Sequence, residues 1–324
     1  MGRTLRIPGG ARGLHKGDRE GRAPPYGRKG VPLRDIDTHS CRGVHKDRKG
    51  RRNGGMAVKI GFSLTVEEDK AEDLLRAVKE AGFQGVEPTF HPKGIPSPEH
   101  PERGAAMLKE LAERLGLEVP SMRGGPLFWD VFPFQVGRTL DITRKALEAV
   151  RAMGGDTLLV VPGRWREETS YLELYKRGVE MAGKMGRMAE EIGVRIGFEN
   201  VENKFLLSPK EWCDFLDDVG DLWVGMYFDV GNVIYIGLGY PQDWIRDLGA
   251  RIRRVHFKDT REKEVLPLME GDVGWEAVME ALGAISYDNW AFVELPLPEG
   301  DPRDFLKRTY RKASEIAGLG QTYI

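Results

Sequence analysis

The sequence predicts a (β/α)8 barrel as a single domain, and three observations support this fold class. From Met56 onward there are roughly 270 residues, enough for one large α/β domain. Over this length eight short apolar runs alternate with eight longer amphipathic stretches, as in the strand–helix pairs of a closed barrel. An open doubly wound sheet is less favoured, because no glycine-rich phosphate turn follows the first apolar run.

The eight predicted strands are short apolar runs. We expect them at 58–64, 85–90, 118–124, 156–163, 195–201, 223–230, 252–259 and 289–296. In a barrel their C-terminal ends all face one rim, where catalytic groups gather.

The eight predicted helices show apolar residues every three or four positions. We expect them at 66–81, 103–115, 137–153, 170–192, 208–218, 241–249, 275–283 and 302–317. Gly82, Gly116 and Gly193 follow three of them, where a left-handed glycine commonly ends a helix.

Residues 1–55 differ in composition from the barrel sequence, residues 56–324. They hold 15 Lys/Arg and five Asp/Glu and show no apolar period. Such a segment cannot bury enough apolar surface to offset its conformational entropy, so we expect a disordered basic extension. It can be non-native upstream translation, since Met56 directly precedes the first strand and RKGRRNGG is what an in-frame purine-rich ribosome-binding sequence encodes. The alternatives are a nonspecific tail or an arm for nucleic acid.

The whole chain has ordinary soluble composition. No apolar run approaches the roughly 18 residues of a membrane span, and no secretory signal is evident at the start. Cys41 and Cys213 form neither a disulfide framework nor a zinc motif. We therefore expect a cytoplasmic protein that does not bind membranes. Asn and Gln are scarce, as in many thermophilic proteins.

Four consecutive predicted strands carry a metal-binding type of side chain at or near their C-terminal ends. These residues are Glu199, Asp229, His256 and Glu294. Three carboxylates packed together would raise one another's pKa unless a cation compensates them. Oxygen-rich ligation with one nitrogen suits Mn²⁺, our first choice, and also Mg²⁺, Co²⁺ or Zn²⁺. The sequence therefore predicts a site for one divalent metal ion.

Each of these residues also has a simpler explanation. An acidic residue after a strand is often a helix N-cap or a loop charge, and a histidine in a strand can be a satisfied core residue. Their occurrence on four successive strands favours the metal site. His256 adds weight, because the barrel sequence has only two other histidines, His91 and His100.

The motifs around these residues resemble the xylose-isomerase-like barrel superfamily, specifically its ketose and sugar-phosphate 3-epimerases and isomerases. The motifs are GFENVENKF, YFDVGN, VHFKD with GDVGW behind it, and FVELP, in the family's order. The resemblance covers essentially residues 56–318. Through NKFLLSPKE and YPQDWIRDLGARIRRVHFKD it looks closest to the L-ribulose/L-xylulose 5-phosphate 3-epimerase and hexulose-6-phosphate isomerase branch.

The resemblance implies that Glu199, Asp229, His256 and Glu294 bind one divalent metal, and that Glu199 and Glu294 are also the acid/base pair. Such a pair can move a proton next to a ketose carbonyl through an enediolate, with C3 epimerisation as the first expectation. Aldose–ketose isomerisation uses the same groups. Many free-sugar 3-epimerases carry a histidine three residues after the metal-binding aspartate, where this chain has Asn232. This departure favours the phosphate branch.

Polar residues near the same rim are candidates for substrate binding. They are Glu87, Arg164, Asn200, Asn232, Lys258 and Arg261. A loop charge is the alternative for Glu87 and Arg164. Trp129 and Phe132 can form an apolar wall or lid over the substrate, or simply pack in their loop. We expect a small sugar or sugar phosphate as ligand, and a homodimer or homotetramer as in many related enzymes.

Three other functions were weighed against this interpretation. A DNA-repair endonuclease of the same superfamily needs a histidine-rich three-metal cluster, and the barrel sequence is acidic, so nucleic acid is not an expected partner. An inosose-type dehydratase keeps the same four ligands and remains an alternative. A non-catalytic sugar-binding barrel also remains, although loss of Glu199 or Glu294 would be expected there.

Overall fold

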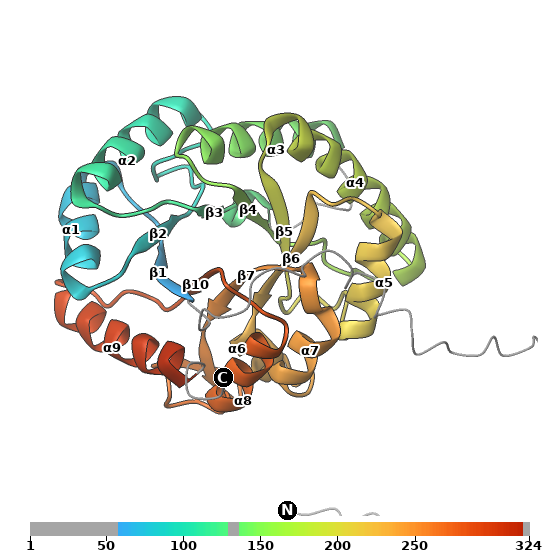
Figure 1. Ribbon diagram of the computed structural model, residues 1–324. Coiled ribbons are helices and arrows are strands. Elements are labelled where there is room, and N and C mark those ends of the chain that lie inside the picture. Colours follow the sequence, from blue (N-terminus) through green and yellow to red (C-terminus); the bar gives the residue numbers. More distant parts are fainter. Residues whose placement is uncertain (1–57, 129–135, 320–324) are drawn as a thin grey trace, which may run out of the picture. The chain divides into compact units, whose positions relative to one another are not determined.

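The computed structural model describes residues 58–128 and 136–319. These residues form a parallel eight-stranded sheet that closes into a barrel, with helices around its outer side (Figure 1). The predicted (β/α)8 fold is confirmed. The predicted extension, residues 1–55, lies outside the described residues, and so do Trp129 and Phe132.

The barrel strands pair in parallel in the order β2-β1-β10-β7-β6-β5-β4-β3. Their bounds are β1 (Lys59–Leu64), β2 (Gly85–Pro88), β3 (Ser121–Arg123), β4 (Thr157–Val160), β5 (Arg195–Glu199), β6 (Val224–Asp229), β7 (Ile252–Phe257) and β10 (Trp290–Val293). The barrel closes between β2 and β3 through few backbone contacts. Thr89 pairs with Arg123, and the Phe90 amide donates to the Arg123 carbonyl at 2.7 Å.

The described residues form nine α-helices, and each of them except α6 overlaps a predicted range. They are α1 (Ala71–Ala81), α2 (Pro101–Leu115), α3 (Val136–Ala152), α4 (Tyr171–Ile192), α5 (Pro209–Val219), α6 (Val230–Ile236), α7 (Pro241–Leu248), α8 (Trp275–Ala284) and α9 (Arg303–Leu319). Ser170 and Ser208 cap α4 and α5 by accepting hydrogen bonds at 3.2 Å. Gly82, Gly116 and Gly193 end α1, α2 and α4 with positive φ angles.

Two elements were not predicted, and both follow strands that carry candidate ligands. Helix α6 starts directly after β6 and is too short to show an apolar period. A hairpin of β8 (Asp259–Arg261) and β9 (Glu264–Leu266) follows β7. The expected 66–81 helix is also shorter, because a 3₁₀ turn at Glu68–Lys70 precedes α1.

Alternate residues of each strand face the helices or the barrel interior. On the outside, Phe228 stacks on Trp244 of α7, and Phe257 packs edge-on against Trp275 of α8, with ring centroids 6.2 Å and 5.0 Å apart. This outer layer is the main apolar core of the described residues.

A separate apolar cluster fills the barrel interior. It consists of Leu159, Tyr227, Trp290 and Phe292. Two glycines make room for its rings: a Cβ atom at Gly61 would lie 2.3 Å from the Phe292 ring, and one at Gly197 would lie 3.1 Å from Tyr227. Because this cluster excludes water, polar side chains buried next to it must bind one another.

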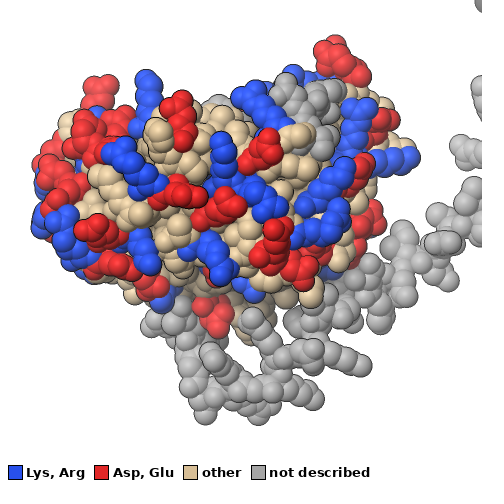
Figure 2. Space-filling view, turned by 90° about the horizontal axis from the view of Figure 1, so that it is seen from above, with Lys and Arg blue, Asp and Glu red and all other residues tan. Residues whose placement is uncertain are grey.

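Charged side chains of both signs are interspersed on the face shown in Figure 2. On the helices, several charged side chains pair with one four residues away, such as Arg76 with Glu72 and Lys184 with Glu180. That view therefore shows no continuous basic patch. In the described part of the chain no helix is both long and apolar enough to cross a bilayer.

Asp259, the first residue after Lys258, anchors the loop behind the hairpin. Its fully buried carboxylate accepts hydrogen bonds from the backbone amides of Thr260, Met269 and Val273 and from the indole of Trp275, at 2.7–3.2 Å. We expect Asp259→Ala to lower the free energy of unfolding by about 3 kcal/mol, because it leaves several buried donors unpaired. Urea denaturation followed by circular dichroism measures this loss.

Asp272→Ala is the matched control, because Asp272 lies in the same loop but pairs with Arg261 at the surface. That change should cost less than about 1 kcal/mol. Equal losses in the two variants would contradict the anchoring role of Asp259.

Candidate metal centre

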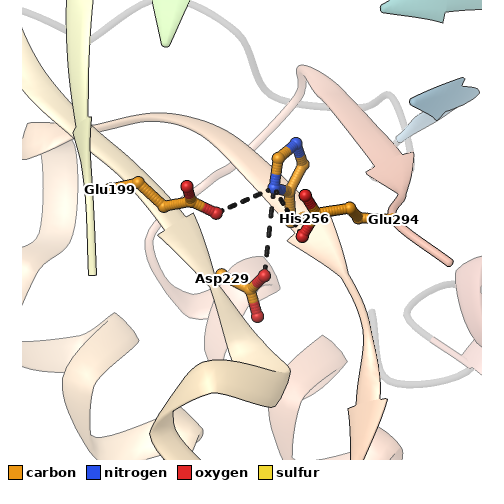
Figure 3. A group of neighbouring side chains, drawn as sticks. All are labelled: Glu199, Asp229, His256 and Glu294. Carbon is orange, nitrogen blue, oxygen red and sulfur yellow. Dashed lines mark hydrogen bonds and ion pairs between the residues drawn. The ribbon is translucent and has the colours of Figure 1, made fainter. Parts of the chain in front are cut away.

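Four side chains from neighbouring strands converge at the C-terminal end of the barrel (Figure 3). One ligand atom from each of Glu199, Asp229, His256 and Glu294 lies within 4.8 Å of all the others. His256 Nδ1 is 3.1 Å from Glu199 Oε1, 3.9 Å from Asp229 Oδ2 and 3.7 Å from Glu294 Oε2. The structure thus brings together the four residues predicted to bind a metal.

The strand register explains this convergence. Asp229 lies opposite His256 in the β6–β7 pair, and Glu199 ends β5 on the other side of β6. The Glu294 amide continues the β10–β7 ladder by donating to the Phe257 carbonyl at 3.1 Å. Each of the four side chains therefore points inward from the C-terminal end of its strand, and its apolar neighbours along the strand face outward.

Asp229 is a helix N-cap as well as a member of the cluster. Its Oδ1 accepts a hydrogen bond from the Asn232 amide at 2.8 Å, which caps α6. Its Oδ2 instead faces His256 and Glu294. The simpler explanation considered for this residue is thus correct for one oxygen, while the other remains directed at the cluster.

Two asparagines hold this corner of the site together. The Asn200 side chain bonds both the amide and the carbonyl of Asp229 at 2.9 Å. The side-chain nitrogen of Asn232, Nδ2, donates to the backbone carbonyl of Asn200 at 2.8 Å. These contacts favour an anchoring role for Asn200 over the predicted contact with substrate.

The cluster has the properties of a cation site. Asp229 Oδ2 and Glu294 Oε2 are buried and have no well-directed hydrogen bond among the described residues. The ammonium of Lys258 lies 2.8 Å from Asp229 Oδ2 and also forms an ion pair with Glu294 Oε2. A positive group thus already occupies this end of the cluster. The ligand atoms lie within 4.8 Å of one another, close to the roughly 4–4.6 Å that separates opposite ligands of a bound Mg²⁺ or Zn²⁺.

The carboxyl groups of the cluster have pKa values shifted in opposite directions. Burial raises the pKa of Glu199 and of Asp229 above the usual carboxyl range. Burial alone would do the same to Glu294. The positive charges of Lys258 and His256 outweigh it, however, and with Arg123 they hold the pKa of Glu294 well below its usual range.

Arg123 was missed by the sequence analysis. It is the last residue of β3, and its guanidinium forms an ion pair with Glu294 Oε1 and donates to Thr89 Oγ1 at 2.8 Å. It is largely buried, with a side chain 22% exposed. The signal that could have found it is a cation at the C-terminal end of a barrel strand.

Glu87, which was predicted to contact the sugar, lies below the rim, inside the barrel. Its carboxylate is fully buried and bonded to His256, Ser63, Ser121 and Tyr227. Burial opposes its ionisation, but the neighbouring His256 and Arg123 hold the pKa of Glu87 below its usual range. This position favours support of His256 over contact with substrate.

A cavity of about 440 Å³ opens beside Glu294 of the cluster, a size typical of small-molecule sites. It is lined by Ser63, Leu64, Thr65, Arg123, Lys258, Val265, Glu294, Leu295, Pro296 and Leu297. Of the predicted substrate-binding residues, Lys258 belongs to this lining. Arg164 is exposed after β4, and Arg261 directs its guanidinium to Asp272 and to the Glu270 carbonyl.

Residues 75–313 match the family described as the xylose isomerase-like TIM barrel. The chain belongs to this family. The match includes β5, β6, β7 and β10, and hence the whole candidate metal centre.

Two curated relatives match part of the chain. An uncharacterized protein of Methanocaldococcus jannaschii is 25% identical over 168 residues, 48% of this chain and 56% of that protein. Inosose dehydratase of Clostridium perfringens is 23% identical over 149 residues, 40% of this chain and 49% of that enzyme. The chain spans about half the length of these curated relatives.

Several solved structures of the xylose isomerase-like type share the fold. The apo form of 3-keto-D-glucoside 4-epimerase from E. coli has a TM-score of 0.67 at 17% identity, covering 80% of this chain and 99% of that one. An L-ribulose 3-epimerase has a TM-score of 0.68 at 17% identity, covering 82% and 96%. A D-tagatose 3-epimerase-like protein has a TM-score of 0.68 at 21% identity, covering 82% and 99%. At these identities the likeness shows the fold.

Metal analysis tests the centre directly. After incubation with Mn²⁺ and desalting, we expect about one equivalent per chain in the wild type. Glu199→Gln and His256→Ala should each reduce it severalfold, because each removes a ligand. Elemental analysis by mass spectrometry measures the stoichiometry. Glu202→Gln is the control, because Glu202 lies three residues from Glu199 but pairs with Lys263 at the surface. Full retention of metal by His256→Ala would contradict the centre.

Proposed function

We propose that the protein is a divalent-metal-dependent epimerase or isomerase of ketose sugars, with C3 epimerisation as the first reaction to test. The observation that carries this proposal is the convergence of Glu199, Asp229, His256 and Glu294, of which Glu294 lines an open cavity. The epimerases among the structural neighbours support it through a shared fold.

The four converging side chains would hold the ion, and the set of oxygen atoms with one nitrogen suits Mn²⁺, Mg²⁺, Co²⁺ or Zn²⁺. When bound, the ion would supply Lewis-acid polarisation of a substrate carbonyl and offset the negative charge that develops as a proton leaves the adjacent carbon.

Glu199 and Glu294 are suited to the proton transfers. They lie on β5 and β10, which flank β6 and β7 in the sheet, so they approach the centre from two sides. Lys258 and Arg123 keep Glu294 ionised, so that it can accept the proton from the carbon next to the carbonyl. Glu199, whose pKa is raised, can return a proton to the opposite face. Exchange with water then resets both carboxyl groups.

A dehydratase is the second candidate, because inosose dehydratase of Clostridium perfringens is among the relatives. That reaction begins with the same removal of a proton next to a ketone. It differs in the second step, where the neighbouring carbon loses its hydroxyl group as water. An absorbance band of the resulting conjugated ketone would distinguish it.

The charges around the cavity favour an uncharged substrate. The buried carboxylates are Glu87, Glu199, Asp229 and Glu294, and the buried cations are Arg123 and Lys258. Counting all four carboxylates as ionised and His256 as neutral, one divalent ion makes this set electrically neutral, and a proton on Glu199 adds one positive charge. Arg123 and Lys258 are already paired with the carboxylates, and the other lining residues besides Glu294 carry no charge. Among the described residues, the cavity lining therefore offers no unpaired cation to a phosphate group.

Solvent-exchange experiments test the reaction. In D₂O the Mn²⁺-loaded protein should exchange the C3 proton of at least one ketose, measured by mass spectrometry and, after removal of the metal, by NMR. Glu199→Gln and Glu294→Gln should slow the exchange at least about 100-fold, because each removes one proton-transfer group.

Glu202→Gln should exchange at the wild-type rate. Exchange at C1 instead of C3 would identify an aldose–ketose isomerase. Absence of exchange with every ketose and ketose phosphate, despite a loaded metal, would contradict the proposed catalysis and favour a sugar-binding barrel.

Pairs of a free ketose and its terminal phosphate test the charge argument. We expect kcat/KM for the free sugar to exceed that for the phosphate at least about tenfold, because the phosphate finds no unpaired cation. Val265→Lys places a cation in the cavity wall and should narrow this ratio, while Val265→Gln should leave it unchanged. A preference of the wild type for the phosphate would contradict the argument.

A further inference from the structure

Glu87 is a buried carboxylate that the proposed proton transfers do not use. It lies in the middle of β2, and its side chain reaches across the barrel interior to β1, β3, β6 and β7. It is fully shielded from solvent, so no substrate in the cavity can reach it. Its position directly behind His256 calls for another role.

Four donors surround the Glu87 carboxylate. Oε2 accepts from Ser63 Oγ at 2.7 Å and lies 2.7 Å from His256 Nε2. Oε1 accepts from Ser121 Oγ at 3.0 Å and from the Tyr227 hydroxyl. An ionised carboxylate accepts hydrogen bonds but donates none, so the nitrogen of His256 that faces it must carry a proton.

This contact determines which nitrogen of a neutral His256 is a free ligand. A neutral imidazole has one N–H, and Glu87 keeps it at Nε2. The lone pair is then on Nδ1, the atom that faces Glu199, Asp229 and Glu294. The Tyr227 ring packs against the imidazole with centroids 4.6 Å apart, which also limits rotation of the ring.

We propose that Glu87 is a positioning residue: it holds His256 as the Nε2–H tautomer and directs Nδ1 at the metal. This inference rests on the metal centre of the proposed function. Hydrogen bonds of this kind behind a ligand histidine typically change metal affinity by about 10- to 100-fold. Ser63, Ser121 and Tyr227 in turn hold the carboxylate in place.

Zn²⁺ alone serves as the probe, because it is diamagnetic and needs no substrate. Protein labelled with ¹⁵N-histidine and loaded with Zn²⁺ should show His256 with a protonated Nε2 and a ligated Nδ1. The His256→Gln spectrum assigns the signal. Ligation through Nε2, or loss of the Nε2 proton, would overturn the proposal.

Zn²⁺ affinity, measured by competition with a chromophoric chelator, tests the role of Glu87 itself. Glu87→Gln keeps the shape of the side chain but removes its charge, and it should weaken Zn²⁺ binding about 10- to 100-fold. Ser121→Ala disturbs the same buried network but leaves the carboxylate beside His256, and it should remain within about threefold of the wild type.

The remaining outcomes separate the two proposals. Affinity of Glu87→Gln within threefold of the wild type, or an equal loss in both variants, would overturn the positioning role and leave the metal centre intact. A wild type that binds no Zn²⁺ would instead contradict the proposed function. If Glu87→Gln does not fold, the wild-type spectrum alone decides the tautomer.

Discussion

Compensation of buried negative charge is the constraint on which the site depends. Four carboxylates lie in and just beneath the C-terminal end of the barrel, and an apolar cluster closes the interior below them. Desolvated carboxylates so close together are costly unless cations or hydrogen bonds balance them. Lys258 and Arg123 supply two positive charges. When all four carboxylates are ionised, the remaining two negative charges match the one divalent ion of the proposed function.

The positions of the strand ends were predictable because all C-terminal strand ends of a barrel lie on the same rim. Once eight alternating runs indicate the fold, Glu199, Asp229, His256 and Glu294 must meet on one rim. The apolar outward neighbours, such as Phe198 and Phe228, fix which side of each strand faces inward. The fold and the meeting of these four side chains thus follow from periodicity and order along the chain.

Depth within the barrel was not predictable in the same way. Glu87 and Arg123 belong to β2 and β3, the two strands that close the barrel. These strands pair only through two isolated β-bridges, so small shifts of one strand along the other decide which side chains meet. The sequence could place Glu87 near the rim but could not show that it reaches beneath His256. Helix α6 and the β8–β9 hairpin escaped prediction because they are too short to display a period.

The geometry of the ligands is held by the protein scaffold. Asn200 fixes the backbone of Asp229 from β5, Asn232 returns to Asn200, and Asp229 caps the helix that carries Asn232. This closed set of bonds leaves only one Asp229 oxygen for the cluster. A ligand oxygen that is oriented before an ion arrives loses little entropy on binding it. The N-cap and the ligand are therefore complementary roles of one side chain: capping α6 is what directs the second oxygen of Asp229 at the centre.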